Sequence, residues 1–325
     1  MQSKSKRFSL SKLSISCFIL FSVADGGFTL LSQSSFLSAR AFHTFCGETT
    51  SQSRDGHPIS VVYESDRILA IDKPHDIPHH NGGGKNDLGI LSVLRQAQSR
   101  GDLGYQGRLY GVHRLDRVTS GILLLAKDAE MASVLTKAFR EGNVTKYYVG
   151  ISNKKRTKKK QGWVKGNMVR GRRKAWYLTR EMDETATNMA VTRFFTANLA
   201  PFRASALDQQ TPPMTCILFR PFTGRTHQLR VAAKSVGLPL AGDPIYSDGS
   251  TGSLSERRTC LHASAFHVDL REHEHETVSI WSPPSFASHL YQAEEDRSGL
   301  NNVVIQLMQK NCNCESILEL LDRYH

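Results

Sequence analysis

The sequence HRLDRVTSG at residues 113–121 stands directly before the apolar run ILLLA at 122–126, so a group of charged residues leads into a buried strand. Within it, Asp116 lies between Arg114 and Arg117. Positive charges within a few ångströms favour the ionised form of a carboxylate, which suits Asp116 to be a nucleophile or an anchor and not a proton donor. Taken alone, an exposed salt bridge in a loop explains this stretch equally well.

The pattern around this stretch predicts a mixture of strands and helices. Strands are expected at residues 61–63, 68–71, 121–127, 144–151, 189–197, 214–219, 261–270 and 277–281, and helices at 86–100, 128–141, 227–236 and 302–323. Asn86 or Asp87 is expected to cap the first helix and Asp128 the second. The order lacks regular βαβ units, which predicts an α+β fold with a mixed, largely antiparallel central sheet and peripheral helices.

Composition divides the chain into three parts: residues 1–57, a main domain at 58–290 with a basic insertion at 153–181, and a helical extension at 291–325. The first part begins with basic residues, contains an apolar run at 13–24 and many serines, and has three acids, which is typical of a targeting presequence. A secretory signal and a transit peptide both fit, and a two-step presequence satisfies both. We expect a plastid or mitochondrial destination, with the cytoplasm as the alternative.

The apolar run at 13–24 is shorter than the roughly 17 residues that a membrane-spanning helix needs. We therefore expect no membrane association of the mature protein.

The charge balance indicates a polyanionic partner. Lys and Arg number 42 against 30 Asp and Glu, a formal net charge of +12, which favours nucleic acid ahead of an acidic membrane. Residues 151–180 contain Lys and Arg but no Asp or Glu, with aromatic residues interleaved, a mixture that suits phosphate contacts and base stacking. The candidate contacts there are Lys158, Lys159, Lys160, Arg172 and Arg173. A solvated basic loop or a nuclear localisation signal is the alternative.

The sequence gives little support for a metal or cofactor. The six cysteines are scattered and lack the C-x2-C spacing of zinc sites, which indicates a reducing compartment. Glycines 82–84 lack the spacing of a phosphate-binding P-loop. We expect no metal and no cofactor.

Two further stretches carry groups that could act on a substrate. In KYY at 146–148 the strand alternation allows only one tyrosine to face a given site. In FTGRTHQLR at 222–230, a glycine turn opens a helix bearing Arg225 and Arg230, next to His227 and Gln228. Cations and free N–H groups at a helix start form a receptor for phosphate or carboxylate.

Together with GLPLAGDPIY at 237–246, these stretches, in this order, resemble the RluA-type RNA pseudouridine synthase family over about residues 59–283. The resemblance implies that Asp116 is the nucleophile, that Tyr148 and not Tyr147 packs on the target base, and that Arg230 pairs with Asp116. It also implies that Arg114 helps to hold a flipped nucleotide out of its helix. The remaining residues expected to contact RNA or substrate are His113, Arg225, His227 and Gln228.

The resemblance implies an isomerase that converts uridine to pseudouridine in structured ribosomal or transfer RNA, without cofactor, as a monomer. A catalytically silent RNA-binding protein that keeps the same fold is the competing hypothesis. A metal-dependent nuclease built on Asp116, His113 and His227 is disfavoured, because such sites usually gather several carboxylates.

Overall fold

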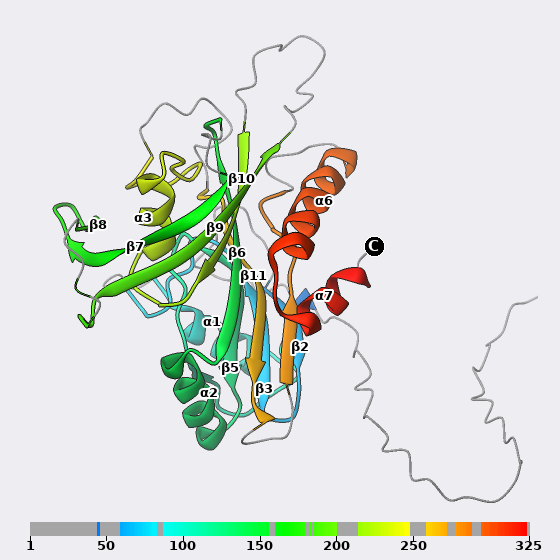
Figure 1. Cartoon of the computed structure of the whole chain (residues 1–325). Helices are drawn as coiled ribbons and strands as arrows, with labels where there is room; N and C mark the ends of the chain where they lie inside the picture. The colour runs from blue at the N-terminus through cyan, green and yellow to red at the C-terminus, as the bar shows by residue number, and fades with distance from the viewer. Residues whose placement is uncertain are drawn as a thin grey trace, which may run out of the picture. The chain divides into compact units, whose positions relative to one another are not determined.

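The computed structural model describes residues 44–45, 59–82, 87–155, 160–179, 183, 185–199, 214–247, 258–271, 277–287 and 294–323. Its strands form a sheet in the order β1-β2-β3-β5-β11-β6-β10-β9-β7-β8, with β12 paired to β11 and β4 to β5 (Figure 1). The pairing of β5 with β11 is parallel, whereas the other ladders are antiparallel. This confirms the expected α+β fold with a mixed, largely antiparallel sheet and peripheral helices.

The strands are β1 (Thr44–Phe45), β2 (Ile59–Glu64), β3 (Ile68–Lys73), β4 (Tyr110–Gly111), β5 (Ser120–Ala126), β6 (Val144–Ser152), β7 (Gln161–Arg170), β8 (Trp176–Leu178), β9 (Met189–Leu199), β10 (Met214–Pro221), β11 (Leu261–Asp269) and β12 (Thr277–Trp281). The helices are α1 (Ile90–Ser99), α2 (Ala129–Glu141), α3 (Gln228–Ser235), α6 (Glu294–Asn311) and α7 (Glu315–Asp322).

Strand β5, which follows the HRLDRVTSG stretch, is buried along its whole length. Gly121 near its start has φ +108°, and a Cβ there would lie 2.4 Å from the carbonyl oxygen of Ala263 on β11. An L side chain would meet both backbone strain and this clash, so only glycine allows β11 to approach so closely. The last residue of the HRLDRVTSG stretch therefore packs directly against β11 in the centre of the sheet.

The sheet separates two apolar cores, and adjacent residues of β6 belong to different ones. Tyr148 lies in the core that contains residues of α1 and α2, such as Leu94 and Leu135. Tyr147 lies in the core that contains residues of α6 and α7, such as Val304. We call these two sides the Tyr148 face and the Tyr147 face of the sheet.

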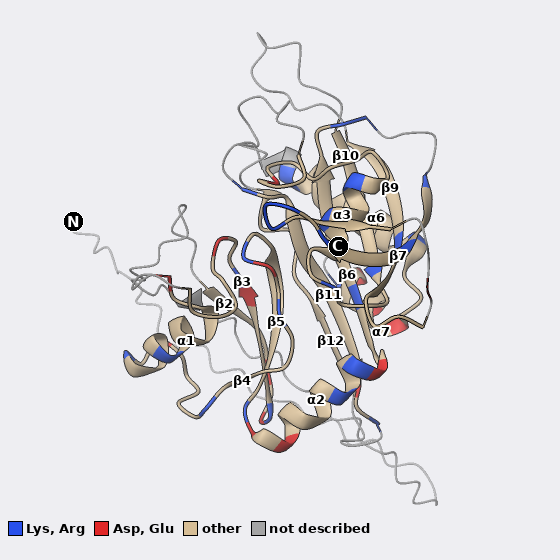
Figure 2. Ribbon diagram, turned by 90° about the vertical axis from the view of Figure 1, so that its left-hand side faces the viewer, with Lys and Arg blue, Asp and Glu red and all other residues tan. Residues whose placement is uncertain are grey.

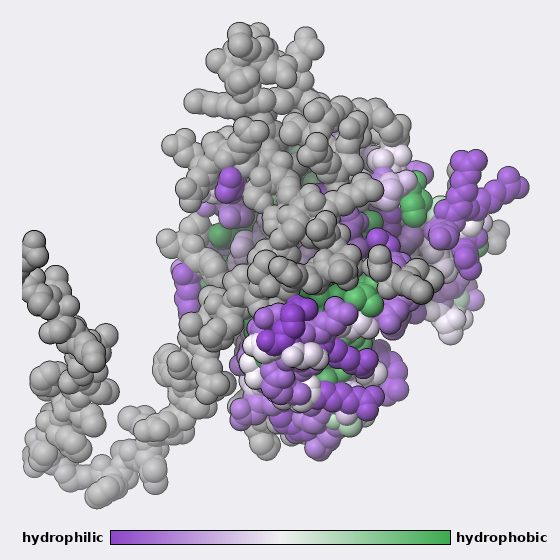
Figure 3. Space-filling model, turned by 180° about the vertical axis from the view of Figure 1, so that it is seen from behind, coloured by the Kyte–Doolittle hydropathy of each residue, from purple (hydrophilic) through white to green (hydrophobic). Residues whose placement is uncertain are grey.

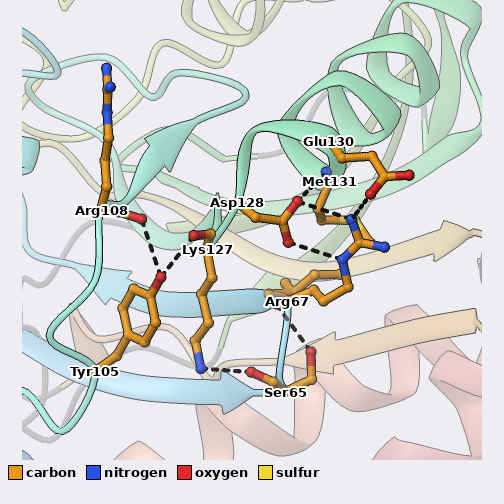
Figure 4. A network of polar contacts seen from close by, with 9 residues as sticks. Ser65, Arg67, Tyr105, Arg108, Lys127, Asp128, Glu130 and Met131 are labelled. Atoms are coloured by element: carbon orange, nitrogen blue, oxygen red, sulfur yellow. Dashed lines mark hydrogen bonds and ion pairs between the residues drawn. The ribbon is translucent and has the colours of Figure 1, made fainter.

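The start of α2 is held by an ion-pair network (Figure 4). Asp128 caps the helix, as expected, by accepting a hydrogen bond from the backbone N–H of Met131 at 2.8 Å. Arg67 donates from Nε and Nη2 to the same carboxylate at 2.9 Å each, and also reaches Glu130. The hydrogen bonds from Arg67 lower the pKa of Asp128 to about 2, so this cap stays charged at neutral pH.

The prediction that Asn86 or Asp87 caps α1 is wrong. The helix begins after Gly89, whose backbone N–H donates to Oδ1 of Asn81 at 2.8 Å. Asp87 instead forms an ion pair with Arg117 at 3.0 Å, and Asn86 lies outside the described residues. The helix α1 therefore begins without a side-chain cap.

The single C-terminal helix expected at 302–323 is two helices, α6 and α7. The break between them falls at residues 312–314, where Asn313 accepts a hydrogen bond from the Tyr147 hydroxyl at 3.2 Å. Breaking the helix here lets both segments cover the Tyr147 face. No helix within the described ranges is long and apolar enough to cross a bilayer.

Two other segments bear on the expected division of the chain. Part of the basic insertion at 153–181 forms β7 and β8, which extend the sheet beyond β9. Thr44–Phe45, within the first 57 residues, pairs with Ile59 and Ser60 as β1. The other residues of 1–57 lie outside the described part.

Candidate active site around Asp116

Asp116 lies beside a buried arginine that a second carboxylate holds in place. Nη1 of Arg230, on α3, is 3.6 Å from Oδ2 of Asp116. The same guanidinium donates from Nε and Nη2 to Asp243 at 2.7 and 2.8 Å. Arg230 and Asp243 are buried, whereas the Asp116 side chain is 19% exposed. The guanidinium therefore has a fixed position, and Asp116 is the carboxylate of the three-residue set that a substrate can reach.

Asp243 is itself fixed by the backbone. Its Oδ1 accepts hydrogen bonds from the N–H groups of Ile245 at 2.9 Å and Tyr246 at 3.0 Å. The turn formed by the GDPIY sequence therefore holds the Asp243 carboxylate in a fixed position. The bidentate geometry of Arg230 on Asp243 then sets the direction of the remaining Nη1 group toward Asp116.

His227 and Tyr246 close one side of this arrangement. His227 is the residue before α3 and has φ 58°, a left-handed conformation. Its Nδ1 is 2.9 Å from the Tyr246 hydroxyl, and the Tyr246 ring lies 5.0 Å from Cζ of Arg230. Burial lowers the pKa of His227, while the charge of Asp116 opposes this shift. The strained turn thus holds a neutral imidazole within the electrostatic reach of Asp116.

Tyr148 belongs to the same site, and Tyr147 does not. The Tyr148 ring lies 6.2 Å from that of Phe266, and its residue is 9% exposed. Burial, and after it the charge of Asp116, raise the pKa of Tyr148 well above its usual range, so the phenol stays protonated. Tyr147 contacts the α6–α7 connection on the other face. Strand alternation therefore separates the two tyrosines as expected.

Lys73 ties the loop of Asp116 to the end of β3. Its buried ammonium donates to the carbonyls of Pro74 at 2.7 Å, Ile77 at 3.0 Å and Arg117 at 3.4 Å. Burial lowers the pKa of Lys73 to about 7, against the opposing charges of Asp76, Asp116 and Asp72. Lys73 is thus an internal cross-link between two loops at the site.

Beneath the Asp116 loop, a buried polar network joins β3, β5, β11 and the segment after β12. Arg258 donates to the hydroxyl of Ser120 at 2.8 Å, and that hydroxyl is 2.9 Å from Nδ1 of His262. Ser282 donates to Asp72 at 3.0 Å. Burial raises the pKa of Asp72 to about 6. Because Ser120 follows the HRLDRVT residues directly, this network fixes the base of the loop.

Two residues expected to contact RNA point inward. Nε2 of His113 accepts a hydrogen bond from the N–H of Leu124 at 2.9 Å, its ring stacks on Phe139, and burial lowers its pKa to about 3. Gln228 donates to Thr192 and accepts from the N–H of Arg225. The positions of His113 and Gln228 do not fit the expected RNA contacts, because their polar atoms are used within the fold.

The other candidate RNA contacts that the structure describes lie on the surface, apart from the half-buried His227. Arg114 is exposed, and Arg225 is exposed although its Nε donates to the carbonyl of Met189 at 3.0 Å. Arg172 and Arg173 are exposed in the turn between β7 and β8, and Lys160 is exposed just before β7. Lys158 and Lys159 lie outside the described residues. Figure 2 shows Lys and Arg (blue) recurring on the ribbon around α3, β7 and β9.

Three residues of the site were missed by reasoning from the sequence: Asp243, Tyr246 and Lys73. The sequence contains a signal for Asp243 and Tyr246, because GDPIY combines an acid and an aromatic residue with a glycine and a proline, which restrict or extend the backbone conformations available. Lys73 carried no comparable signal, because a lysine at a strand end is usually exposed. Among the described residues, no three or more His, Cys, Asp or Glu side chains are grouped to hold a metal ion.

The sequence of this chain is similar to those of several known proteins. Residues 67–235 match the family model described as RNA pseudouridylate synthase. An uncharacterized RNA pseudouridine synthase of Haemophilus influenzae is 36% identical over 213 residues, which are 65% of this chain and 82% of that protein. Ribosomal large subunit pseudouridine synthase C of Rickettsia typhi is 34% identical over 209 residues, which are 64% of this chain and 62% of that protein.

Two solved human structures share the fold. RNA pseudouridylate synthase domain containing 1 superposes with a TM-score of 0.54 at 22% identity, covering 75% of this chain and 94% of that one. RNA pseudouridylate synthase domain containing 4 superposes with a TM-score of 0.53 at 25% identity, covering 71% and 90%.

Proposed function

Because the chain belongs to the RNA pseudouridylate synthase family, we propose that it isomerises uridine to pseudouridine in structured RNA and that Asp116 is its nucleophile. The observation that carries this proposal is the partly exposed Asp116 carboxylate beside Arg230, which the buried Asp243 orients. The reaction breaks the bond between N1 of uracil and C1′ of ribose and forms a bond from C5 to C1′. The proton lost from C5 is balanced by the proton gained at N1.

In this proposal each residue has a separate task. Asp116 attacks the substrate as the nucleophile, and the Arg230 guanidinium, 3.6 Å away, directs its carboxyl group. The Tyr148 ring packs on the uracil, which must leave its stack at a cost of a few kcal/mol. Arg114, exposed next to this site, takes the place that the extruded nucleotide leaves.

We propose large-subunit ribosomal RNA as the substrate. The support is that several relatives carry names with that substrate, among them the synthase C of Rickettsia typhi and the synthase D of Nitrosomonas europaea, the latter 30% identical over 240 residues. The chain spans less than two thirds of the length of these two relatives. Pseudouridine mapping of ribosomal and transfer RNA, with and without the protein in cells, decides between the two RNA classes.

The deciding experiment replaces Asp116 with Asn. The Asp116→Asn protein should fold and bind RNA like the wild type but form no pseudouridine, measured by carbodiimide mapping on RNA from cells that lack the protein. Asp269→Asn, which alters the exposed ion pair with Arg271, is the matched control and should remain active. Product formed at a comparable rate by Asp116→Asn would refute the assignment. Absence of product from the wild type on every RNA tested would favour the silent RNA-binding alternative.

We propose a plastid or mitochondrial location for the protein. The support is the basic, serine-rich and acid-poor composition of residues 1–57. A fluorescent reporter fused behind these residues should enter an organelle, and a diffuse cytoplasmic signal would contradict the proposal.

A further inference from the structure

Outside the active site, the described surface has an aromatic cluster surrounded by cations. Trp163 on β7 and Phe222 after β10 are 49% and 44% exposed, and their rings lie 5.2 Å apart at 36°. Lys165, Arg193 and Arg220 surround these two rings. We call these five residues the Trp163 patch.

Each cation of the Trp163 patch contacts an aromatic ring. Nζ of Lys165 and Cζ of Arg193 lie 5.5 and 5.4 Å from the Trp163 ring, and Cζ of Arg220 lies 4.8 Å from the Phe222 ring. Strands β7, β9 and β10 contain no Asp or Glu. Positive charge is therefore concentrated around exposed rings without a local carboxylate on these strands to neutralise it.

The strand register places the Trp163 patch on the Tyr147 face, opposite to the face of the active site. Trp163 pairs with Arg193, and Arg193 pairs with Arg220, so the three side chains point to one side. Cζ of Arg220 lies 5.8 Å from the Tyr147 ring, which identifies that side. Val164 and Phe194, the next residues along β7 and β9, point to the Tyr148 face and belong to its core.

Part of β7 is an edge of the sheet between its two faces. This strand pairs with β9 along residues 161–167 and with β8 at 168–170, so its edge at 161–165 lacks a strand partner among the described residues. Arg172 and Arg173 lie in the turn that connects β7 to β8. Figure 3, seen from behind, shows hydrophilic side chains projecting from the end of the sheet that carries β7 and β8 in Figure 1, next to a small apolar area.

We propose that the Trp163 patch binds unpaired nucleotides of the same RNA whose uridine enters the active site. Bases stack on Trp163 and Phe222, and their phosphates lie against Lys165, Arg193 and Arg220, the combination used by proteins that hold single strands. This inference rests on the proposed function and narrows it. The substrate is RNA with an unpaired segment beside the target stem, long enough to turn around the β7 edge.

The test uses the full chain and a fluorescein-labelled 12-nucleotide oligoadenylate, which has no uridine to enter the active site. Trp163→Ala should weaken its binding roughly five- to a hundredfold in fluorescence anisotropy, as expected for the loss of one stacking ring. Trp163→Phe should stay within threefold of the wild type, because it keeps a ring. Tyr110→Ala removes another half-buried ring, 4.8 Å from Arg108, and as the matched control should bind normally.

A second readout leaves the Trp163 patch itself unchanged. In a protein whose Trp176 and Trp281 are replaced by Phe, the fluorescence of Trp163 should be quenched on adding the oligoadenylate. Equal affinity of Trp163→Ala and the wild type, together with an absence of quenching, would overturn the inference. Sedimentation that shows dimers abolished by Trp163→Ala would also overturn it, in favour of a contact between copies of the chain.

Failure of this inference is distinct from failure of the proposed function. Trp163→Ala should modify a short stem-loop at the wild-type rate and show a raised KM on RNA that extends beyond the stem. Wild-type KM on the long RNA would refute the patch and leave the enzymatic activity standing. Quenching without any pseudouridine formation would support the patch and refute the activity.

Discussion

At the scale of single residues, the position of Asp116 depends on a carboxylate that does not reach the substrate. Asp243 takes two of the donors of Arg230 and leaves Nη1 directed at Asp116. Removing one partner of a buried ion pair typically costs about 3 to 5 kcal/mol, because the other charge remains buried. The activity and the stability of the protein are therefore linked through Arg230.

Asp243→Asn tests this link. The variant should lose several kcal/mol of unfolding free energy, measured by urea denaturation, and most of its pseudouridine formation. Asp269→Asn, which breaks the exposed ion pair with Arg271, is the control and should change stability by less than about 1 kcal/mol. Normal activity in a folded Asp243→Asn protein would show that Asp116 is oriented by other groups.

Tyr148 offers a second test at this scale. If its ring packs on the uracil, Tyr148→Phe keeps the stacking surface and should retain much of the activity, whereas Tyr148→Leu should lose most of it. The rates of pseudouridine formation under single-turnover conditions give the comparison. Similar rates in both variants would exclude stacking as the main role of this ring.

The sequence predicts which face of a strand these side chains occupy, but not their contacts with distant segments. Alternation along KYY correctly separated Tyr147 from Tyr148, because a strand has only two faces. The inward positions of His113 and Gln228 could not be predicted, since a polar side chain near a site can equally face the substrate or bond to the backbone of a distant strand. The GDPIY sequence marks Asp243 as unusual, but its ion pair with Arg230 forms only when α3 packs against the loop that follows it.

At the scale of secondary-structure elements, the strands expected from apolar runs are present, whereas β1, β4, β7 and β8 were not expected. Two helix ends depended on tertiary contacts. Asn81, in a preceding loop, accepts a hydrogen bond from Gly89, the residue before α1, and no side chain caps this helix. Tyr147, more than 150 residues earlier in the chain, contacts the break between α6 and α7. Local patterns do not contain such contacts, so both helix boundaries differed from the expectation.

The β7–β8 turn carries a prediction about salt. Replacing Arg172 and Arg173 with Gln removes two exposed cations, which should weaken RNA binding and reduce the slope of log K against log salt by between about one and two. Lys137 and Arg140 on α2 are also exposed, and their double replacement with Gln is the matched control. An unchanged slope in the turn variant would mean that RNA does not contact this turn.

At the scale of the whole molecule, the buried network beneath the Asp116 loop predicts a pH dependence of stability. The pKa of Asp72 is raised from 3.8 to about 6, so the folded protein binds this proton more tightly than the unfolded chain. The resulting stabilisation is complete below pH 3.8 and is lost as the pH rises through 6. Burial causes the shift, because it disfavours the charged carboxylate.

Asp72→Asn keeps the shape and removes the titration. Between pH 4 and 6, the unfolding free energy of the wild type should fall relative to this variant by up to about 3 kcal/mol, measured by chemical denaturation at each pH. A constant difference between the two proteins across this range would show that Asp72 is not a buried titrating group.

The parallel pairing of β5 with β11 has a consequence for how the protein acquires its structure. Ser120, at the start of β5, lies beside His262 on β11. The two strands can therefore pair only when a loop of about 140 residues between them has closed. Contacts between segments so far apart in sequence slow folding, because loop closure must precede the gain from pairing. We therefore expect Asp116 and Arg230 to meet late during folding, and refolding kinetics followed at the active site to lag behind the formation of local helices such as α2.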